Sequence, residues 1–287
     1  MKSTSRRNFL KASAAAAAAA SLGTRTLSAA PPLRQPIGLQ LYSVREQLPK
    51  DFDGTLHQLG AIGYVEVEAA GYFGRTAQEF RHSMDQAGLR CVSTHHPMNQ
   101  LKPHLDEDIE YAHTLGLSYI VCPSPMRKEP GASGPLNLED WRWVAGELNK
   151  IGEKVKAAGM TFGYHNHGPE FGTENGTVFY DELLRLTDPK LVVFEMDCGW
   201  VRAAGQDPVA YISWSPERFP LLHVKDLSKG PGGELHSNIL GKGIIDYKPI
   251  FRAATGLKHY FIEQEEFDGD PIEALTQDAK YMKKLEL

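Results

Sequence analysis

The stretches LVVFEMD (residues 191–197), LLHVKD (residues 221–226) and YFIEQE (residues 260–265) share one pattern, in which an apolar run ends in ionisable residues spaced two apart. Side chains at positions i and i+2 of a strand point to the same face, so both members of a pair can be directed at one place. Six predicted strands end in such polar pairs, which are Glu66/Glu68, Ser93/His95, His165/His167, Glu195/Asp197, His223/Lys225 and Glu263/Glu265. The pattern indicates buried parallel strands with chemistry at their C-terminal ends.

Strands alternate with helical segments along the chain, which indicates a parallel sheet with right-handed crossovers. Helix signals include a capping box at Thr76, and helix starts at Asp106, at Asn137 or Leu138, and at Asp270. No Gly-rich dinucleotide fingerprint follows the first strand. We expect eight strands, over residues 37–42, 64–69, 89–94, 118–122, 161–165, 191–197, 221–225 and 259–263. The sequence therefore predicts an α/β fold, a single (β/α)8 TIM barrel with its active site at the C-terminal ends of the strands.

The N-terminal region reads as an export signal. A twin-arginine sequence, SRRNFLK (residues 5–11), precedes an alanine-rich stretch and a small-residue cleavage context at residues 28–30. The apolar stretch is shorter than the roughly 20 residues that span a bilayer. We predict a cleaved Tat signal peptide over residues 1–30 and the barrel domain over residues 31–287. The mature protein is then expected in the periplasm, exported by the twin-arginine pathway, without a membrane partner.

The charge balance disfavours a nucleic-acid partner. The 287-residue chain has a net charge of −5, and residues 1–30 hold five basic residues and no acids, so the remainder carries −10. Binding to nucleic acid draws its affinity largely from basic residues on phosphates. Three cysteines, an odd and sparse count, predict buried unpaired thiols rather than a disulfide framework. Two long connections after strands, residues 123–135 and 226–246, are candidate lids or substrate-binding loops.

A metal site is the chemistry that the strand ends favour. Two imidazoles and two carboxylates, from His165, Asp197, His223 and Glu263, lie at the ends of four strands. This mixed set suits Mn²⁺, Co²⁺, Zn²⁺, Fe²⁺ or Ni²⁺ better than Ca²⁺, which prefers oxygen alone. Charges gathered in a barrel mouth are costly unless they are paired or metal-bound. We therefore expect one divalent metal ion as the cofactor.

Acid/base groups accompany this set. Lys225 is either a base, or a clamp on an oxyanion, or the partner of a salt bridge to Asp197 or Glu263. His167 and Glu170, just past the fifth strand, are further acid/base candidates. Rings near the strand ends either stack on the C–H faces of a sugar or fill the core; they are Tyr42, Tyr72, Phe73, Phe171, Trp200 and Phe267.

With these residues in view, the chain after residue 30 resembles the xylose-isomerase-like barrel superfamily, the sugar phosphate isomerase/epimerase group. The resemblance implies a divalent metal at the ends of strands five to eight, with Asp197, His223 and Glu263 on ligand positions. It also puts Glu68 and His95 at the rim of the substrate pocket. The segments that carry it are IGLQLYSVR (37–45), GYVEVE (63–68), YHNH (164–167), DCGW (197–200), HVKD (223–226), GKG (241–243) and IEQ (262–264).

The chain departs from that family at two places. Many members have Glu-Asn-His where this chain has His165-Asn166-His167, so the strand-five ligand is either His165 or Glu170. Many members also have histidine where this chain has Trp200. Exported relatives with the Tyr-His-Asn-His sequence resemble proteins that process oxidised (3-keto) sugars and glycosides.

These observations predict a metal-dependent sugar isomerase or epimerase acting on a non-phosphorylated or oxidised sugar. A base (Glu263, Glu170 or Lys225) would remove the proton next to a carbonyl and give an enediolate. The alternative is a 3-keto-glycoside lyase or hydratase that uses the same enolate chemistry. A non-catalytic periplasmic sugar-binding protein is a third hypothesis, and a phosphodiesterase of the AP-endonuclease type is disfavoured by the acidic charge. A homodimer is compatible with the barrel fold, although no interface is marked in the sequence.

Overall fold

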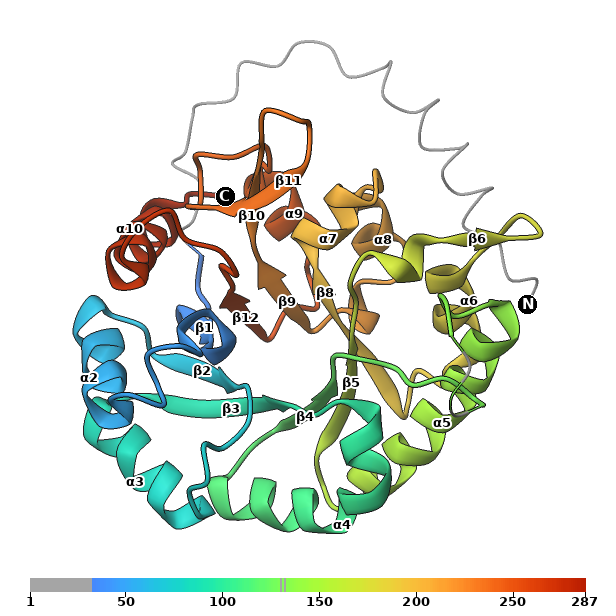
Figure 1. Ribbon diagram of the computed structural model, residues 1–287, viewed down its shortest axis with the longest axis horizontal. Coiled ribbons are helices and arrows are strands. Elements are labelled where there is room, and N and C mark those ends of the chain that lie inside the picture. The colour runs from blue at the N-terminus through green and yellow to red at the C-terminus, as the bar shows by residue number, and fades with distance from the viewer. Residues whose placement is uncertain (1–32, 130, 132) are drawn as a thin grey trace.

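The computed structural model describes residues 33–129, 131 and 133–287, so the predicted signal peptide, residues 1–30, lies outside the described residues. Within them, eight parallel strands close a barrel: β1 (Gly38–Gln40), β2 (Glu66–Ala69), β3 (Arg90–His95), β4 (Tyr119–Cys122), β5 (Thr161–His165), β8 (Val192–Asp197), β9 (Leu221–Val224) and β12 (His259–Ile262). Their order around the barrel is β1-β12-β9-β8-β5-β4-β3-β2. Figure 1 shows helices forming an outer ring around the strands. The predicted (β/α)8 fold is confirmed.

The outer helices begin and end largely where the sequence signals lie. Thr76 and Glu79 form the expected capping box, and Asn137 and Asp140 form a second one. The helices are α2 (Phe52–Ile62), α3 (Ala77–Ala87), α4 (Met98–Leu115), α5 (Leu138–Ala157), α6 (Phe179–Leu186), α7 (Cys198–Ala203), α8 (Pro208–Trp214), α9 (Tyr247–Ala253) and α10 (Pro271–Lys284). Short 3-10 helices cover Leu41–Val44, Pro169–Phe171 and Pro216–Arg218.

Several predicted boundaries differ from the structure by one or more residues, and two of the differences are informative. The helix α4 begins at Met98 and is kinked at His104, next to Pro103, so the helix expected to start at Asp106 corresponds to its second segment, and the first segment was not predicted. The first strand was expected to reach residue 42 but ends at Gln40. The Gln40 side chain accepts a hydrogen bond from the backbone N–H of Tyr42, which caps a 3-10 helix and ends the extended backbone.

The barrel interior has a polar floor at its N-terminal end. Glu66, the first residue of β2, accepts hydrogen bonds from the Arg90 guanidinium and from His259 Nδ1, the latter at 2.7 Å. We call Glu66, Arg90 and His259 the floor cluster. Glu66 and Glu68 share a face, as predicted, but they do not reach the same place. A register shift between β2 and β3 sets Glu66 opposite Arg90 and Glu68 opposite Ser93.

An apolar layer lies above this floor. Phe261 lies between His259 and Glu263 on the inner face of β12 and packs with Val92, Val121 and Leu221. Gly38 on the neighbouring strand makes room for it, because a Cβ atom there would come within 2.8 Å of the Phe261 ring. The polar groups at the two ends of the barrel are thus separated by packed side chains.

The long connection after β9 contains a hairpin that the sequence analysis did not predict. Its strands are β10 (Asp226–Lys229) and β11 (Leu235–Asn238), which pair antiparallel. The Asp226 carboxylate then fixes the return of the chain by accepting four backbone N–H bonds, from Leu227, Gly241, Gly243 and Ile245. A second hairpin, β6 (Thr173–Glu174) and β7 (Thr177–Val178), follows β5.

The three cysteines, Cys91, Cys122 and Cys198, are buried and unpaired, which confirms that prediction. None of the helices in the described part of the chain has both the length and the apolar character needed to cross a bilayer.

Candidate active site

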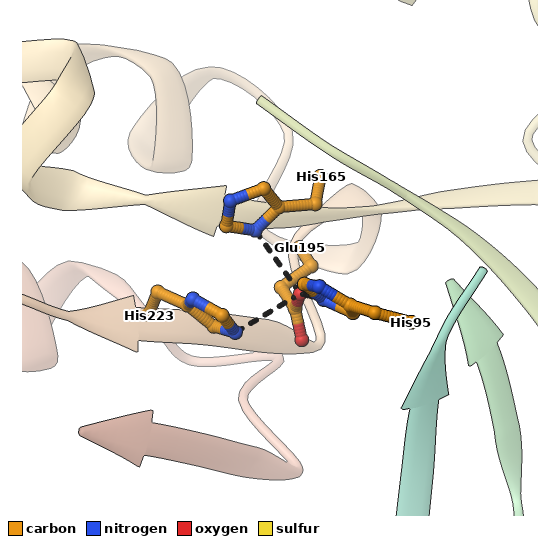
Figure 2. Close-up of side chains that lie close together, drawn as sticks. All are labelled: His95, His165, Glu195 and His223. Atoms are coloured by element: carbon orange, nitrogen blue, oxygen red, sulfur yellow. Dashed lines mark hydrogen bonds and ion pairs between the residues drawn. The ribbon is translucent and has the colours of Figure 1, made fainter. Parts of the chain in front are cut away.

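Three imidazoles converge on one carboxylate at the C-terminal end of the barrel. The residues are His95, His165, Glu195 and His223, from four different strands (Figure 2). Oε2 of Glu195 lies 2.7 Å from His95 Nε2, 3.1 Å from His165 Nδ1 and 3.1 Å from His223 Nε2. His165 and Glu195 face each other directly in the β5–β8 pairing. We call these four residues the histidine cluster.

A second group overlaps the first and consists of His165, Asp197, His223 and Glu263. Its four ligand atoms lie within 4.8 Å of one another, and all four side chains are buried. These are the residues that the sequence analysis singled out as metal ligands. We call them the mixed cluster, and it shares His165 and His223 with the histidine cluster.

Lys225 closes the mixed cluster from one side. Its Nζ lies 2.8 Å from Asp197 Oδ2 and 2.9 Å from Glu263 Oε2, and it also bonds Glu265. Burial alone would lower the pKa of Lys225, but the three carboxylates raise it above the ordinary value. The Tyr247 hydroxyl fixes the backbone by bonding both the N–H and the C=O of Lys225. An ammonium with three N–H groups and three carboxylate partners acts as a fixed cation, so the salt-bridge and clamp roles fit better than the base.

Glu68 lies beneath these groups rather than at the rim of the pocket. It is fully buried and accepts hydrogen bonds from Gln40 Nε2 at 2.8 Å and Ser93 Oγ at 2.5 Å. Its Oε2 also lies 2.7 Å from His223 Nε2 and 2.9 Å from His95 Nε2. Burial would raise the pKa of Glu68, but the two imidazoles lower it. Glu68 therefore supports the imidazoles from below.

The imidazoles respond to these carboxylates in opposite ways. Burial would lower the pKa of His95, but Glu68 and Glu195 raise it to about 9. The pKa of His223 is raised well above its usual value against the same penalty of burial, by Glu195 and Glu263. Burial and the neighbouring His223 hold the pKa of His165 well below its usual value. Negative charge is therefore in excess here, and the cluster attracts cations.

The donor set fits a divalent transition-metal ion. Nitrogen and carboxylate oxygen donors within a few ångströms suit Mn²⁺, Fe²⁺, Co²⁺, Ni²⁺ or Zn²⁺. Oε1 of Glu195 is buried without a hydrogen-bond partner among the described residues, although such an atom is costly to leave unsatisfied. A neutral His165 also offers the lone pair that coordination needs.

A cavity of about 430 Å³ opens above the clusters, a size usual for small-molecule sites. We call it the mouth cavity. Its polar and aromatic wall includes Tyr42, His95, His165, His167, Glu263 and Glu265. His95 is thus the predicted rim residue that reaches the cavity, while Glu68 does not line it.

The two acid/base candidates after β5 lie in different surroundings. His167 lines the mouth cavity, and its ring centroid is 4.8 Å from that of His165. Glu170 turns away from the clusters: it accepts hydrogen bonds from the Tyr164 hydroxyl at 2.6 Å and from the His167 backbone N–H at 3.1 Å. Burial raises the pKa of Glu170 to about 7. Of the two predicted strand-five ligands, His165 is the one that the structure brings into the clusters.

The three aromatic residues that were predicted to contact the substrate also lie in different surroundings. Tyr42 is 44% exposed and lines the mouth cavity. The Trp200 ring lies 5.2 Å from Lys225 Nζ. Phe171 lies instead in the hydrophobic core, with its ring 4.9 Å from that of Tyr180, and it does not line the mouth cavity.

Several supporting residues were not found from the sequence. Asn166 accepts a hydrogen bond from the backbone N–H of Asp197 and so fixes the end of β8. Gln40 and Tyr247 hold Glu68 and Lys225, as described above. A buried amide in the last residue of an otherwise apolar strand is the only local signal that Gln40 offered. Tyr247 lies 22 residues from Lys225, so no local pattern links them.

Comparisons with known proteins agree with this architecture. Residues 56–285 match the family model described as "Xylose isomerase-like TIM barrel". The chain belongs to the xylose isomerase-like TIM barrel family. Residues 3–23 match the model of the twin-arginine translocation signal sequence, which indicates export by the Tat pathway.

Individual relatives match nearly the whole barrel. An inosose dehydratase from Lacticaseibacillus casei is 23% identical over 80% of this chain and 88% of its own length. The crystal structure of a sugar phosphate isomerase/epimerase from Parabacteroides distasonis is 31% identical, with a TM-score of 0.73 over 90% of this chain and 96% of that one. The IOLI protein, whose crystal structure has a bound zinc atom, is 14% identical, with a TM-score of 0.66 over 86% of this chain and 96% of that one. At that identity the last match supports the fold alone.

Proposed function

We propose that this protein is a sugar-modifying enzyme, specifically a divalent-metal-dependent isomerase or epimerase that removes a proton next to a carbonyl of a non-phosphorylated or oxidised sugar. One observation carries the proposal: two imidazoles and two carboxylates place their ligand atoms within 4.8 Å of one another beneath the mouth cavity. Family membership and relatives named as sugar isomerase/epimerase and inosose dehydratase support the substrate class. The export signal supports a periplasmic location for the mature enzyme.

The mixed cluster would hold the metal through His165, Asp197, His223 and Glu263. When bound, a divalent ion supplies a Lewis acid that polarises the carbonyl oxygen of a sugar. The histidine cluster offers an alternative set of ligands, in which His95 and Glu195 take the places of Asp197 and Glu263. Lys225 favours the mixed cluster as the site of chemistry, because its ammonium is positioned to stabilise negative charge that develops beside Asp197 and Glu263.

Proton removal is assigned to Glu263. Its Oε2 is occupied by Lys225 at 2.9 Å and by His223 Nδ1 at 3.2 Å. Its Oε1 has no hydrogen-bond partner among the described residues, and Glu263 lines the mouth cavity. A carboxylate that lines the cavity and has one oxygen held by Lys225 and His223 keeps the other oxygen to accept a proton.

Return of the proton is assigned to His167. Its imidazole lines the same cavity, and burial lowers its pKa, so it is neutral at rest and passes on a proton that it takes up from solvent, while Glu263 releases the abstracted proton to solvent. Reprotonation at the neighbouring carbon gives isomerisation, and reprotonation of the opposite face gives epimerisation. If a substituent leaves from the carbon beyond, Glu263 takes the C–H proton, the departing oxygen receives a proton that His167 has first taken up from solvent, and Glu263 then releases its proton to solvent.

The test is hydrogen exchange with solvent. A panel of ketoses and 3-keto-glucosides is incubated in D₂O with the metal-loaded protein and examined by mass spectrometry. We expect one deuterium to enter at the carbon next to the carbonyl, and chelation with EDTA to abolish this exchange. Retention of the aglycone during exchange would support an epimerase, whereas its release would support the elimination reaction.

The variant Glu263→Gln provides the specific test of the base. It should reduce exchange on the order of 10³-fold, as expected when a general base is lost together with its charge. Glu66→Gln is the matched control, because it removes a buried glutamate from the floor of the same barrel. Exchange that persists at full rate in Glu263→Gln would refute the assignment.

A further inference from the structure

A second cavity lies beside the mouth cavity. It is formed by the segment after β4, the first turn of α5, and the segment between β5 and α6. Its volume is about 980 Å³, more than twice the 430 Å³ of the mouth cavity. The two cavities share Pro123, Ser124 and His167 in their walls, so they are neighbours on the same rim of the barrel. We call it the side cavity.

The wall of the side cavity suits a ring-shaped group. Trp141 and Phe179 both line it, and their rings are stacked at 5.9 Å between centroids with an angle of 21°. Pro135 and Leu136 add apolar surface. Pockets that bind organic ligands combine such apolar and aromatic walls with a few fixed polar groups.

Fixed polar groups are present in the same wall. Glu170 is 1% exposed and is held by Tyr164 and by the backbone of His167. The Nε1–H of Trp141 is buried and has no acceptor among the described residues. A buried donor without a partner carries a free-energy cost that a ligand oxygen or a water can remove. Because Trp141 also lines the side cavity, this donor is a second observation, independent of the cavity's size, that supports a ligand there.

We propose that the side cavity is a binding subsite for a second ring joined to the reacting sugar, so that the substrate is a glycoside with a ring-sized, partly apolar aglycone. This inference rests on the proposed function, because it is the mouth cavity that holds the reacting sugar. His167 lies at the boundary between the two cavities, next to the position of the linking oxygen. A single sugar ring needs only the mouth cavity, and a larger neighbouring cavity is then unexplained.

The test compares matched ligands by isothermal titration calorimetry on the metal-loaded mature protein. The probes are methyl and phenyl β-D-glucosides, each in its unoxidised and its 3-keto form. We expect at least tenfold tighter binding of the phenyl than of the methyl compound within the pair that binds. Equal affinities for methyl and phenyl, or binding of neither, would overturn the proposed subsite.

Two variants that introduce a tryptophan, one in each cavity, distinguish the side cavity from the mouth cavity. Thr173 is exposed and lines only the side cavity, whereas Gln100 is exposed and lines only the mouth cavity. Thr173→Trp should fill the subsite and reduce the phenyl-to-methyl preference to about one, and Gln100→Trp should weaken both ligands and keep their ratio. A preference that survives Thr173→Trp would also overturn the subsite.

Failure of this inference and failure of the proposed function are distinguishable. Deuterium exchange into a sugar without any phenyl preference would refute the subsite alone. A phenyl preference without deuterium exchange in any sugar would support the subsite and refute the proposed reaction. Thermal melting of both variants within a few degrees of the wild type checks that the barrel is intact.

Discussion

Two glutamates on one short strand, Glu66 and Glu68, end up in opposite kinds of surroundings. Glu66 lies in the floor cluster, where the Arg90 guanidinium and the His259 imidazole bond its two oxygens. Glu68 lies below the mouth cavity, where His95 and His223, two imidazoles with raised pKa values, share its Oε2, and Gln40 and Ser93 add neutral donors. Both side chains are fully buried. Burial of an acid therefore does not by itself distinguish a structural group from a functional one.

The difference lies in charge balance and in access. At the floor, each carboxylate oxygen has a cationic or ionisable partner within the protein. At the mouth, Glu68, Glu195, Asp197, Glu263 and Glu265 surround one lysine and a group of imidazoles, beneath an open cavity. Retaining uncompensated acid in a buried site is costly, so the mouth has the composition of a site that accepts a cation.

The largest expected effect is the loss of that cation. Asp197→Asn keeps the Oδ1 that caps α7 at Trp200 but removes the charge. If the mixed cluster holds the metal, this variant should lose bound metal and reduce turnover on the order of 10³-fold. Plasma mass spectrometry of the purified protein measures the metal.

The matched variant is Glu195→Gln, which removes charge from the histidine cluster instead. It should keep most of its metal. The opposite result, metal lost in Glu195→Gln and kept in Asp197→Asn, would assign the ion to the histidine cluster.

A substitution in the floor cluster should change the stability of the protein rather than its metal content or its turnover. Glu66→Gln replaces a carboxylate that has two charged or ionisable partners, and it should lower the free energy of unfolding by about 2–3 kcal/mol at pH 7. Metal content and turnover should remain unchanged. Urea unfolding measures the free energy, and elemental analysis measures the metal. Loss of metal in Glu66→Gln would contradict the proposed distinction between the two ends of the barrel.

The pH dependence of this effect follows from the pKa of Glu66. Burial would raise it, but the bonds to His259 and Arg90 lower it below the ordinary 4.5. The folded state therefore gains stability from the ionised form above the ordinary pKa and loses it as the pH falls through the lowered one. The difference between wild type and Glu66→Gln should shrink on acidification below about pH 4.

A buried acid without a cationic bond sharpens the contrast further. Asp278 on α10 accepts the Leu240 N–H at 2.7 Å through Oδ1, while its Oδ2 has no hydrogen-bond partner in the described part of the chain. Burial raises its pKa from 3.8 to about 7. Ionisation above that pKa destabilises the folded state, so Asp278→Asn should stabilise the protein by about 1–2 kcal/mol at pH 8. The gain should decrease between pH 7 and pH 4 and vanish below it, as measured by thermal unfolding; a constant gain at all pH values would contradict the ionisation argument.

The smallest effect is expected at an exposed pair. Lys154 and Asp106 lie 3.3 Å apart with side chains 59% and 85% exposed. Lys154→Ala should change the free energy of unfolding by less than about 0.5 kcal/mol. A larger change in chemical denaturation would show that exposed ion pairs in this barrel cannot serve as the baseline for the buried ones.

The sequence by itself determined the barrel and the end of it that carries the polar groups. Apolar runs that end in ionisable pairs, such as Glu195/Asp197 and His223/Lys225, predict both, because strand periodicity and the direction of parallel strands are local properties. The caps at Thr76 and Asn137 were predictable for the same reason, since a capping box spans four residues. The helical segment from Met98 up to the kink at His104 was not predicted, although Pro103, a local signal for a kink, stands beside it.

Only the tertiary structure decided which of the polar side chains meet. Ring closure brings β3, β5, β8 and β9 to one centre, and so places His95, 100 residues away in sequence, against Glu195. Glu66 lies two residues before Glu68 on β2, and the pairing with β3 sets Glu66 opposite Arg90 at the floor and Glu68 opposite Ser93 nearer the mouth. The packing of Tyr164 draws Glu170 toward the side cavity and leaves His165 with the clusters. These outcomes depend on long-range register and on the burial of charge, which a local sequence pattern does not encode.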